Sequence, residues 1–401
     1  MKIAMVFSVF NKAGGIERAM VEVSTRLIDD GHDVHLVAND RDSAYRHLPF
    51  HYIPMLKPNN PLQMFSFSLA STVALRSWLR KERFDIVHSH GLASLEADVV
   101  TAQSCHRAWV NLSNPTLSPF TWPWLRRRLN PQHPTMMWLE RHIYAGHHYR
   151  KIVAVSEGLK QDIVTWYGVP ADDIVVIPNG VDLDEFNVDT VTTERAATRA
   201  RLGLAPGDCA LLFVANEFPR KGLSQVLDAL TRLPDTVHLV CIGRGNPAPY
   251  LATVERLGLQ PRVHFIPNTP DIRGYYAASD MFVLPTQYES FCIAALEAAV
   301  AGLPLLCTRV QGIEDRLVDG YNGFFVERDG RDIATKVQWL LDNPDQKRIL
   351  GEAARESAQG YGWDAIKDQH VALYHEILTA KRHPRSSRSG SVTRRQEVLT
   401  Q

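Results

Sequence analysis

The chain has 401 residues, of which 45% are hydrophobic, so it can bury a large core and is expected to form two domains rather than one. Its 44 basic residues balance 44 acidic residues, and this neutral total offers no overall field that would attract nucleic acid. The five cysteines form no C-x-x-C pair and lie mostly in apolar runs, which indicates reduced thiols in a cytoplasmic protein rather than a disulfide or zinc framework. No run of 18 apolar residues occurs, so no membrane span is expected.

The first half of the chain alternates short β-branched runs with longer segments of helical periodicity. The opening residues carry no small-residue cleavage site after their apolar run, so they are expected to form a strand and not a signal peptide. Helices are predicted between the strands and include residues 16–30 and 68–82. The predicted strands are residues 3–9, 33–38, 85–89, 97–102, 152–155 and 174–177. Because such alternation is typical of parallel sheets covered by helices, residues 1–178 are expected to form a first α/β domain.

Residues 105–151 differ in composition from the rest of this domain. They hold four tryptophans, and seven Lys and Arg residues stand against a single acid, Glu140. A basic surface with interleaved tryptophan is what a protein resting on an anionic membrane surface would use. An ordinary long insertion with packed tryptophans explains the same residues equally well, so both interpretations stay open.

The alternation of strands and helices occurs a second time after a polar stretch. Pro178, Asn179 and Gly180 end the first set, and no strand is expected from there to about residue 207. The second set of predicted strands is residues 209–216, 237–243, 263–266, 281–285 and 304–308. We therefore expect the domain boundary at residues 178 and 179 and a second α/β domain over residues 179–362.

The C-terminal part of the chain follows the breaker sequence "GYG". Residues 363–382 show the amphipathic pattern of a helix. Residues 383–401 are rich in Ser and Arg and nearly free of large apolar residues, so they are expected to form a disordered basic tail.

Two glutamates, Glu289 and Glu297, are separated by seven mostly apolar residues. If a helix begins near Phe291, the second glutamate lies about 12 Å further along the axis and shares a face with the first. The free backbone N–H groups of Phe291, Cys292 and Ile293 would then lie between the carboxylates and favour an anion. A sugar joined through a diphosphate to a ribose presents hydroxyls, phosphates and hydroxyls in the matching order. The alternative is that Glu289 is an exposed residue that caps the helix and that Glu297 is solvated. The apolar residues on both sides of Glu297 disfavour this alternative.

A second motif, "VANEFPRKGL" at residues 214–223, places a basic loop between a strand and a helix. Loops at the carboxyl ends of parallel strands bind ligands in doubly wound sheets. Arg220 and Lys221 are therefore candidates for neutralising phosphate. Considered alone, the same residues also fit an ordinary charged surface loop.

A third motif, "FNKAGGIERA" at residues 10–19, places a glycine pair between the first strand and the first helix. It is not G-x-G-x-x-G, and no acidic residue follows at the spacing of a dinucleotide fold, which argues against NAD. Gly14 and Gly15 would instead let the backbone approach a ligand closely. Glycines at such turns are also often purely structural.

Together the three motifs resemble those of the GT-B glycosyltransferases of family 4, also called glycosyl transferases group 1, over residues 1 to about 380. These are retaining enzymes that use nucleotide sugars. "GGIER", "FPRKG" and "AAVAGLPLL" look closest to bacterial lipopolysaccharide core glucosyltransferases. The resemblance implies two Rossmann-like doubly wound domains that face each other across a cleft, an acceptor domain first and a nucleotide-sugar domain second. It also implies that "NGVD" (179–182) is the linker and that the helix from Trp363 crosses back to the first domain.

The resemblance implies roles for the residues of the second domain. Glu289 would hold hydroxyls of the donor sugar, and Glu297 would hold the ribose. The backbone amides between them, together with Lys221, would hold the diphosphate. Many relatives carry Arg where this chain has Asn216, so Asn216 is expected at the donor site and Arg220 is expected to supply the missing charge.

In the first domain the resemblance implies a histidine near the cleft. His88 and His90 alternate onto one face of a strand end, and we choose His90 as the catalytic residue on this side, alongside Glu289 and Lys221. A core histidine bonded to the backbone is the alternative. Relatives often have T-x-H at the end of the next strand, where this chain has Gln103, so we expect Gln103 and His106 to bind the acceptor.

The expected activity is transfer of a hexose, with retention, from a nucleoside diphosphate sugar to an acceptor hydroxyl in cell-surface glycan or glycolipid synthesis. UDP-glucose is the favoured donor. No cofactor and no metal are expected, because the D-x-D strings at residues 40–42 and 182–184 lie in a loop and in the linker without further ligands. The enzyme is expected in the cytoplasm or on the inner face of the cell membrane. A sugar-nucleotide epimerase or hydrolase, and a noncatalytic nucleotide-binding relative, are the alternatives.

Overall fold

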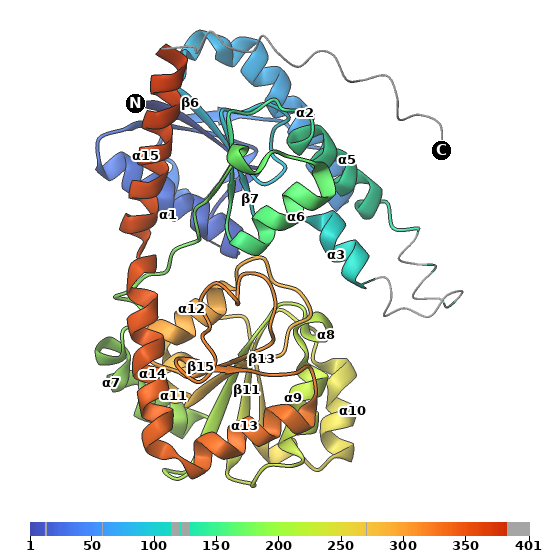
Figure 1. Cartoon of the computed structure of the whole chain (residues 1–401), viewed down its shortest axis with the longest axis vertical. Helices are drawn as coiled ribbons and strands as arrows, with labels where there is room; N and C mark the ends of the chain where they lie inside the picture. The colour runs from blue at the N-terminus through green and yellow to red at the C-terminus, as the bar shows by residue number, and fades with distance from the viewer. Residues whose placement is uncertain are drawn as a thin grey trace.

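The computed structural model describes residues 1–382 apart from residues 13, 58, 114–120, 122–124, 126–128 and 270, and at residues 188–193 it describes the backbone alone. The chain forms two α/β domains stacked end to end (Figure 1). The predicted tail at 383–401 lies outside the described residues, as do two tryptophans and three arginines of the basic segment, at 122, 124 and 126–128.

The first domain is built on a seven-stranded sheet in the order β5-β3-β1-β6-β7-β8-β9, and its strands pair in parallel. Its strands in chain order are β1 (Lys2–Val6), β3 (Asp33–Ala38), β5 (Phe50–Tyr52), β6 (Ile86–His90), β7 (Val99–Ala102), β8 (Lys151–Ala154) and β9 (Ile174–Val176). The order runs outward from β1 in both directions, which makes the sheet doubly wound. Its helices are α1 (Gly15–Asp29), α2 (Asn60–Arg76), α3 (His106–Ser113), α5 (Gln132–Tyr144) and α6 (Glu157–Tyr167).

Alternation along β1 shows how helices cover both faces of this sheet. Ile3 and Met5 belong to a buried cluster with residues of α1, while Ala4 and Val6 belong to a separate cluster with residues of α2. Since successive side chains of a strand point to opposite faces, a strand between two helical layers is apolar on both sides.

The second domain repeats this design with a six-stranded parallel sheet in the order β12-β11-β10-β13-β14-β15. Its strands are β10 (Cys209–Val214), β11 (Val237–Gly243), β12 (Val263–Pro267), β13 (Met281–Leu284), β14 (Leu305–Cys307) and β15 (Gly323–Phe325). Its helices are α7 (Val188–Arg201), α8 (Phe218–Lys221), α9 (Leu223–Leu230), α10 (Ala248–Arg256), α11 (Arg273–Ala278), α12 (Ile293–Val300), α13 (Gly330–Asp342) and α14 (Pro344–Ala358). The strand order reverses between β10 and β13, and the segments that follow these two strands carry the basic motif and the glutamate pair. Ligands bind at such a switch point in doubly wound sheets.

Most predicted elements overlap observed ones, and the main error concerns α2. The helix predicted at 68–82 begins eight residues earlier, at Asn60, because the side chain of Asn59 caps its N-terminus by accepting the Leu62 N–H group and a proline follows. It ends at Arg76 and is followed by a separate 3-10 turn. The prediction also missed the short strands β5 and β15, and a two-stranded ladder of β2 (Val9–Phe10) with β4 (Asp40–Arg41).

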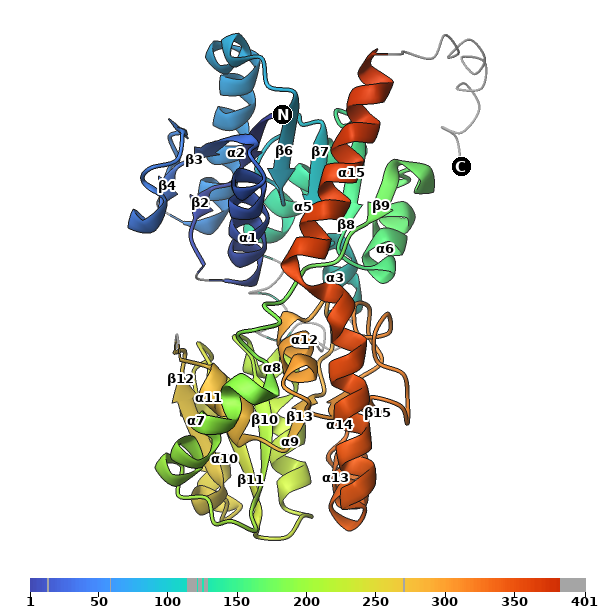
Figure 2. The same ribbon diagram turned by 90° about the vertical axis from the view of Figure 1, so that its left-hand side faces the viewer.

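Two chain segments join the domains. The linker passes Gly180 and Val181, and the Val181 N–H group donates to the Tyr361 carbonyl at 2.9 Å. The last helix, α15 (Trp363–Arg382), begins at this junction and runs along the first domain beside α1 (Figure 2). We therefore propose the division into residues 1–178, 179–362 and 363–382. Among the helices in the described part of the chain, none has the length and apolar character needed to cross a lipid bilayer.

Candidate active site

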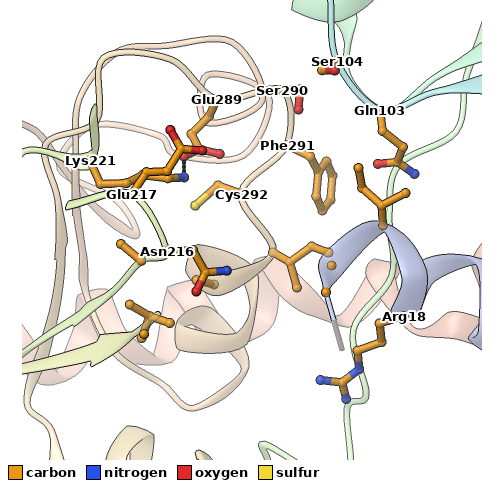
Figure 3. Close-up of a pocket in the computed structure, with 18 of the residues that line it drawn as sticks. Arg18, Gln103, Ser104, Asn216, Glu217, Lys221, Glu289, Ser290, Phe291 and Cys292 are labelled. Carbon is orange, nitrogen blue, oxygen red and sulfur yellow. Dashed lines mark ion pairs between the residues drawn. The ribbon is translucent and has the colours of Figure 1, made fainter. Parts of the chain in front are cut away.

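A cleft of about 1660 Å³ lies between the two domains. Its walls come from the loop after β1, from the segments after β7 and around α5, from the linker, and from the loops after β10 and β13. All the residues predicted to bind donor or acceptor line this cleft, namely Gly14, Gly15, Gln103, His106, Asn216, Arg220, Lys221, Glu289, Phe291, Cys292, Ile293 and Glu297. Several of them are seen together in Figure 3.

The glutamate pair flanks the start of α12, although the helix begins later than predicted. It starts at Ile293 and not near Phe291, because Cys292 adopts a left-handed conformation with φ of 65°. The free N–H groups of the first turn therefore begin at Ile293. Glu289 and Glu297 are both buried, at 7% and 8% exposure, on opposite sides of this N-terminus. The structure therefore has the predicted order of groups, in which the helix N-terminus lies between the two carboxylates.

Two basic residues after β10 contact the first of these carboxylates. Lys221 forms an ion pair with Glu289, drawn as a dashed line in Figure 3. Burial lowers the pKa of the Lys221 ammonium to about 8, and neighbouring Cys292 and Glu217 act in the opposite direction. Arg220 donates to the Tyr288 carbonyl at 2.6 Å and to Glu217 at 3.0 Å, and it lies 3.9 Å from Glu289. The helix N-terminus is thus flanked by two cations that can meet a phosphate.

The second carboxylate has partners from both domains. Glu297 accepts a hydrogen bond from the Tyr276 hydroxyl at 2.7 Å and one from the Arg18 guanidinium at 3.4 Å. Burial raises the pKa of Glu297, while Arg18 and Tyr276 oppose that rise. Neither partner of Glu297 was predicted from the sequence. Arg18 stands within the quoted "GGIER" string, so a charged residue one turn after the glycine pair was the available signal.

The glycine pair brings the first domain close to the start of α12. A Cβ atom on Gly15 would lie 3.0 Å from Cδ1 of Ile293. Asn216 lies on the other side of the cleft, where its side-chain oxygen accepts the Arg244 N–H group at 3.1 Å. It therefore connects the end of β10 to the loop after β11.

The first-domain wall contains the two predicted acceptor residues. The side-chain amide of Gln103 exchanges two hydrogen bonds, at 3.1 and 3.0 Å, with that of Asn179 in the linker. The His106 ring lies 2.9 Å from the His133 ring, between Nε2 and Nδ1. The N–H group of His106 donates to buried Glu140 at 2.6 Å, and burial raises the pKa of that carboxyl to about 7. These contacts hold the Gln103 amide and the His106 ring at the wall of the cleft.

His90 is the predicted site residue that does not reach the cleft. It is 2% exposed, and neither ring nitrogen has a hydrogen-bond partner among the described residues. Its ring stacks on that of His88, with centroids 4.2 Å apart, and burial together with His370 of α15 lowers its pKa to about 3. The prediction that His90 lies on the cleft wall is wrong, because its face of β6 is covered by the last helix.

The D-x-D strings serve as turn caps. Asp42 accepts the N–H group of Ala44 at 3.0 Å, and Asp182 accepts those of Asp184 and Glu185 at 3.1 and 2.9 Å. In the described part of the chain, no group of three or more His, Cys, Asp or Glu side chains is arranged to hold a metal ion. The expected independence from metal stays a prediction.

Comparison with known proteins matches both domains to family models and more than nine-tenths of the chain to solved structures. Residues 13–185 match Glycosyltransferase Family 4, and residues 194–357 match Glycosyl transferases group 1. A D-inositol 3-phosphate glycosyltransferase of Xylanimonas cellulosilytica is 28% identical over 405 residues, which cover 93% of each protein. One from Geodermatophilus obscurus is 29% identical over 402 residues, covering 90% of this chain and 84% of that protein.

Two solved structures share the fold. WaaG, a glycosyltransferase involved in lipopolysaccharide biosynthesis, aligns with a TM-score of 0.77 and 20% identity over 93% of this chain and 99% of its own. HepE of Anabaena in complex with UDP-glucose aligns with a TM-score of 0.71 and 18% identity over 94% of this chain and 100% of its own. The chain therefore has the GT-B fold and belongs to the glycosyltransferases of family 4 and group 1.

Proposed function

We propose that this glycosyltransferase moves a hexose, with retention, from a nucleoside diphosphate sugar to an acceptor hydroxyl, and that UDP-glucose is its donor. The observation that carries the proposal is the wall formed by Glu289, the N-terminus of α12 and Glu297, with Lys221 beside it. Its order of groups suits a sugar, a diphosphate and a ribose. The UDP-glucose bound by HepE, a protein of the same fold, supports the choice of donor.

The proposed chemistry is electrostatic. When the bond between sugar and diphosphate breaks, negative charge develops on the leaving phosphate. Lys221, Arg220 and the start of α12 line the cleft together, so the two cations and the first N–H groups of the helix are placed to stabilise that charge. Such an arrangement supplies what a bound cation supplies in metal-dependent transferases, so we propose that no metal is needed. Glu289 would orient the sugar, and attack would occur on the face from which the diphosphate departs.

We propose that the acceptor binds the first-domain wall at Gln103 and His106, and that it belongs to a cell-surface glycan or a glycolipid. A lipid-linked acceptor would suit an enzyme that contacts an anionic membrane on the cytoplasmic side through residues 105–151. Within the described part of that segment, Trp138 is 39% exposed and Leu112 is 48% exposed, and Arg107 is exposed as well. Apolar and cationic side chains together favour an anionic bilayer surface.

The test is a transfer assay in the presence of EDTA with UDP-glucose, UDP-N-acetylglucosamine and GDP-mannose, and with inositol phosphate and lipopolysaccharide-core sugars as acceptors. The expected result is acceptor-dependent release of UDP from UDP-glucose and an α-linked product in the proton NMR spectrum. Release of UDP without an acceptor would identify a hydrolase instead, and conversion of the donor into an epimeric nucleotide sugar without an acceptor would identify an epimerase. A protein that binds nucleotide but turns over none of the donors would be a noncatalytic relative.

A further inference from the structure

Arg18 of α1 contacts carboxylates from three parts of the chain. Its guanidinium donates to Glu297 of the second domain at 3.4 Å, and it forms an ion pair with Glu185 of the linker. Its Nε atom also lies 4.0 Å from Glu22 on its own helix. Arg18 extends from α1 into the region of the cleft shown in Figure 3. A first-domain side chain thus touches the carboxylate proposed to hold the ribose.

The groups around Glu297 show why the contact with Arg18 affects the charge of this carboxylate. The charged and titratable groups that face it are Arg18 from α1, Glu185 from the linker and Tyr276 from α11, with Glu22 behind Arg18. Arg18 is the one cation among these groups. Without it, a buried carboxylate beside a second acidic residue would take up a proton more readily, and its oxygen would lose hydrogen-bond accepting capacity.

We propose that Arg18 is a positioning residue of the donor site, which holds the Glu297 carboxylate ready to accept hydrogen bonds from ribose hydroxyls. The ribose subsite of the second domain is then complete only when the first domain is in place beside it. This inference rests on the proposed function, because it takes the ligand of Glu297 to be the ribose of a nucleoside diphosphate. Ribose recognition and the approach of the acceptor domain are coupled through this one side chain.

The test compares the affinities of UDP and of 2′,3′-dideoxy-UDP by calorimetry at pH 7.5. The wild-type protein should prefer UDP by roughly tenfold or more, since hydrogen bonds to a charged group contribute about 1.5–3 kcal/mol. In Arg18→Ala that preference should fall by about tenfold through weaker UDP binding, while dideoxy-UDP binds as before. The matched control is Arg26→Ala, which removes another arginine of α1 that pairs with Glu22 and Asp364 but does not contact Glu297. Arg26→Ala should keep the wild-type ratio of the affinities for UDP and dideoxy-UDP.

A second readout is the pH dependence of UDP affinity. In Arg18→Ala, UDP binding should weaken at a higher pH than in the wild type as the solution is made more acidic, and Arg18→Lys should restore part of the difference. If Arg18→Ala does not fold, Arg18→Gln keeps most of the side-chain length and serves in its place. Equal weakening of UDP and dideoxy-UDP, or an unchanged ratio, overturns the inference.

The wild-type data separate this failure from that of the proposed function. A wild-type protein that binds neither nucleotide contradicts the proposed function, and the inference falls with it. A wild-type protein that binds UDP and 2′,3′-dideoxy-UDP equally shows that Glu297 does not bind the ribose hydroxyls. The proposed role of Arg18 is then wrong, although the protein still binds the nucleotide.

Discussion

Lys221 can respond to pH in the range in which enzymes are assayed. Burial lowers the pKa of its ammonium to about 8. The cation is present below that pKa and is lost as pH rises through it, so stabilisation of the leaving diphosphate should weaken on the alkaline side. The expected result is a kcat/KM that declines as pH rises through about 8, because kcat/KM reports the ionisation of the free enzyme.

The matched variant is Lys221→Arg, since arginine stays protonated at every pH of the assay. Its overall rate should be lower, because the longer fork does not fit the contact with Glu289, but its alkaline decline should disappear. Lys221→Ala should lose on the order of 10²–10³ in kcat, as expected for removal of one electrostatic contact to the transition state. A decline with the same midpoint in Lys221→Arg would show that another group titrates.

At the residue scale, the sequence predicted the groups that act through local spacing. Glu289, Glu297 and Lys221 lie on one wall because a helix and a strand-to-helix loop place them there. Arg18 and Tyr276 were missed because they reach Glu297 from elements far away in the sequence. The Arg18 contact depends on how the domains pack, and the Tyr276 contact on how α11 packs against α12, and no local pattern contains either arrangement.

At the scale of elements, α15 covers two buried histidines of β6, His88 and His90, and contributes a third, His370. His88 lies between the Tyr374 hydroxyl, 2.6 Å from Nδ1, and the Thr101 hydroxyl, 2.7 Å from Nε2. Its neighbours His90 and His370 have pKa values lowered by burial to about 3 and about 4. Both rings are therefore neutral in the folded protein at neutral pH.

These lowered pKa values predict acid sensitivity. The unfolded chain takes up protons near pH 6.5, whereas the folded chain does not until the pH is much lower, so stability falls as pH drops below about 6.5. For His370 the loss should be about 2 kcal/mol at pH 5. Urea unfolding at pH 7.5 and pH 5 measures it. His370→Phe should reduce the difference between the two pH values, and exposed His47→Gln should not. An equal difference in both variants would contradict this explanation.

The same cluster explains why one site prediction failed. The period of a strand predicts that His88 and His90 share a face, and they do. The strand's own sequence does not tell which helix covers that face. That helix is α15, which begins at Trp363, far along the chain. The left-handed turn at Cys292 was equally invisible, because nothing in its residue type favours a positive φ.

At the scale of the whole molecule, the junction between domains has little free space. A Cβ atom added to Gly180 of the linker would lie 2.5 Å from the ring of Trp363, the first residue of α15. The relative position of the two cleft walls therefore depends on a close glycine–tryptophan contact. The strand alternation predicted the two domains and their order, but this packing could not be predicted.

Gly180→Ala should displace α15 or the linker. We expect a destabilisation of about 1–3 kcal/mol from overpacking and a larger relative loss of transfer activity than of UDP affinity, because the acceptor wall shifts against the donor wall. Thermal unfolding and steady-state kinetics measure the two effects. Gly360→Ala is the matched control, since a Cβ atom there meets nothing within 4 Å. Similar effects of the two substitutions would contradict the role of the contact.

The most direct test of the central claim is calorimetric titration of the purified protein with UDP, GDP and ADP in EDTA. The wild-type protein should bind UDP most tightly of the three. Glu297→Ala should stay folded yet bind UDP at least about tenfold more weakly. Glu255→Ala, at an exposed position on α10, should bind like the wild type. Absence of binding for all three nucleotides, or wild-type affinity in Glu297→Ala, would contradict the donor site described above.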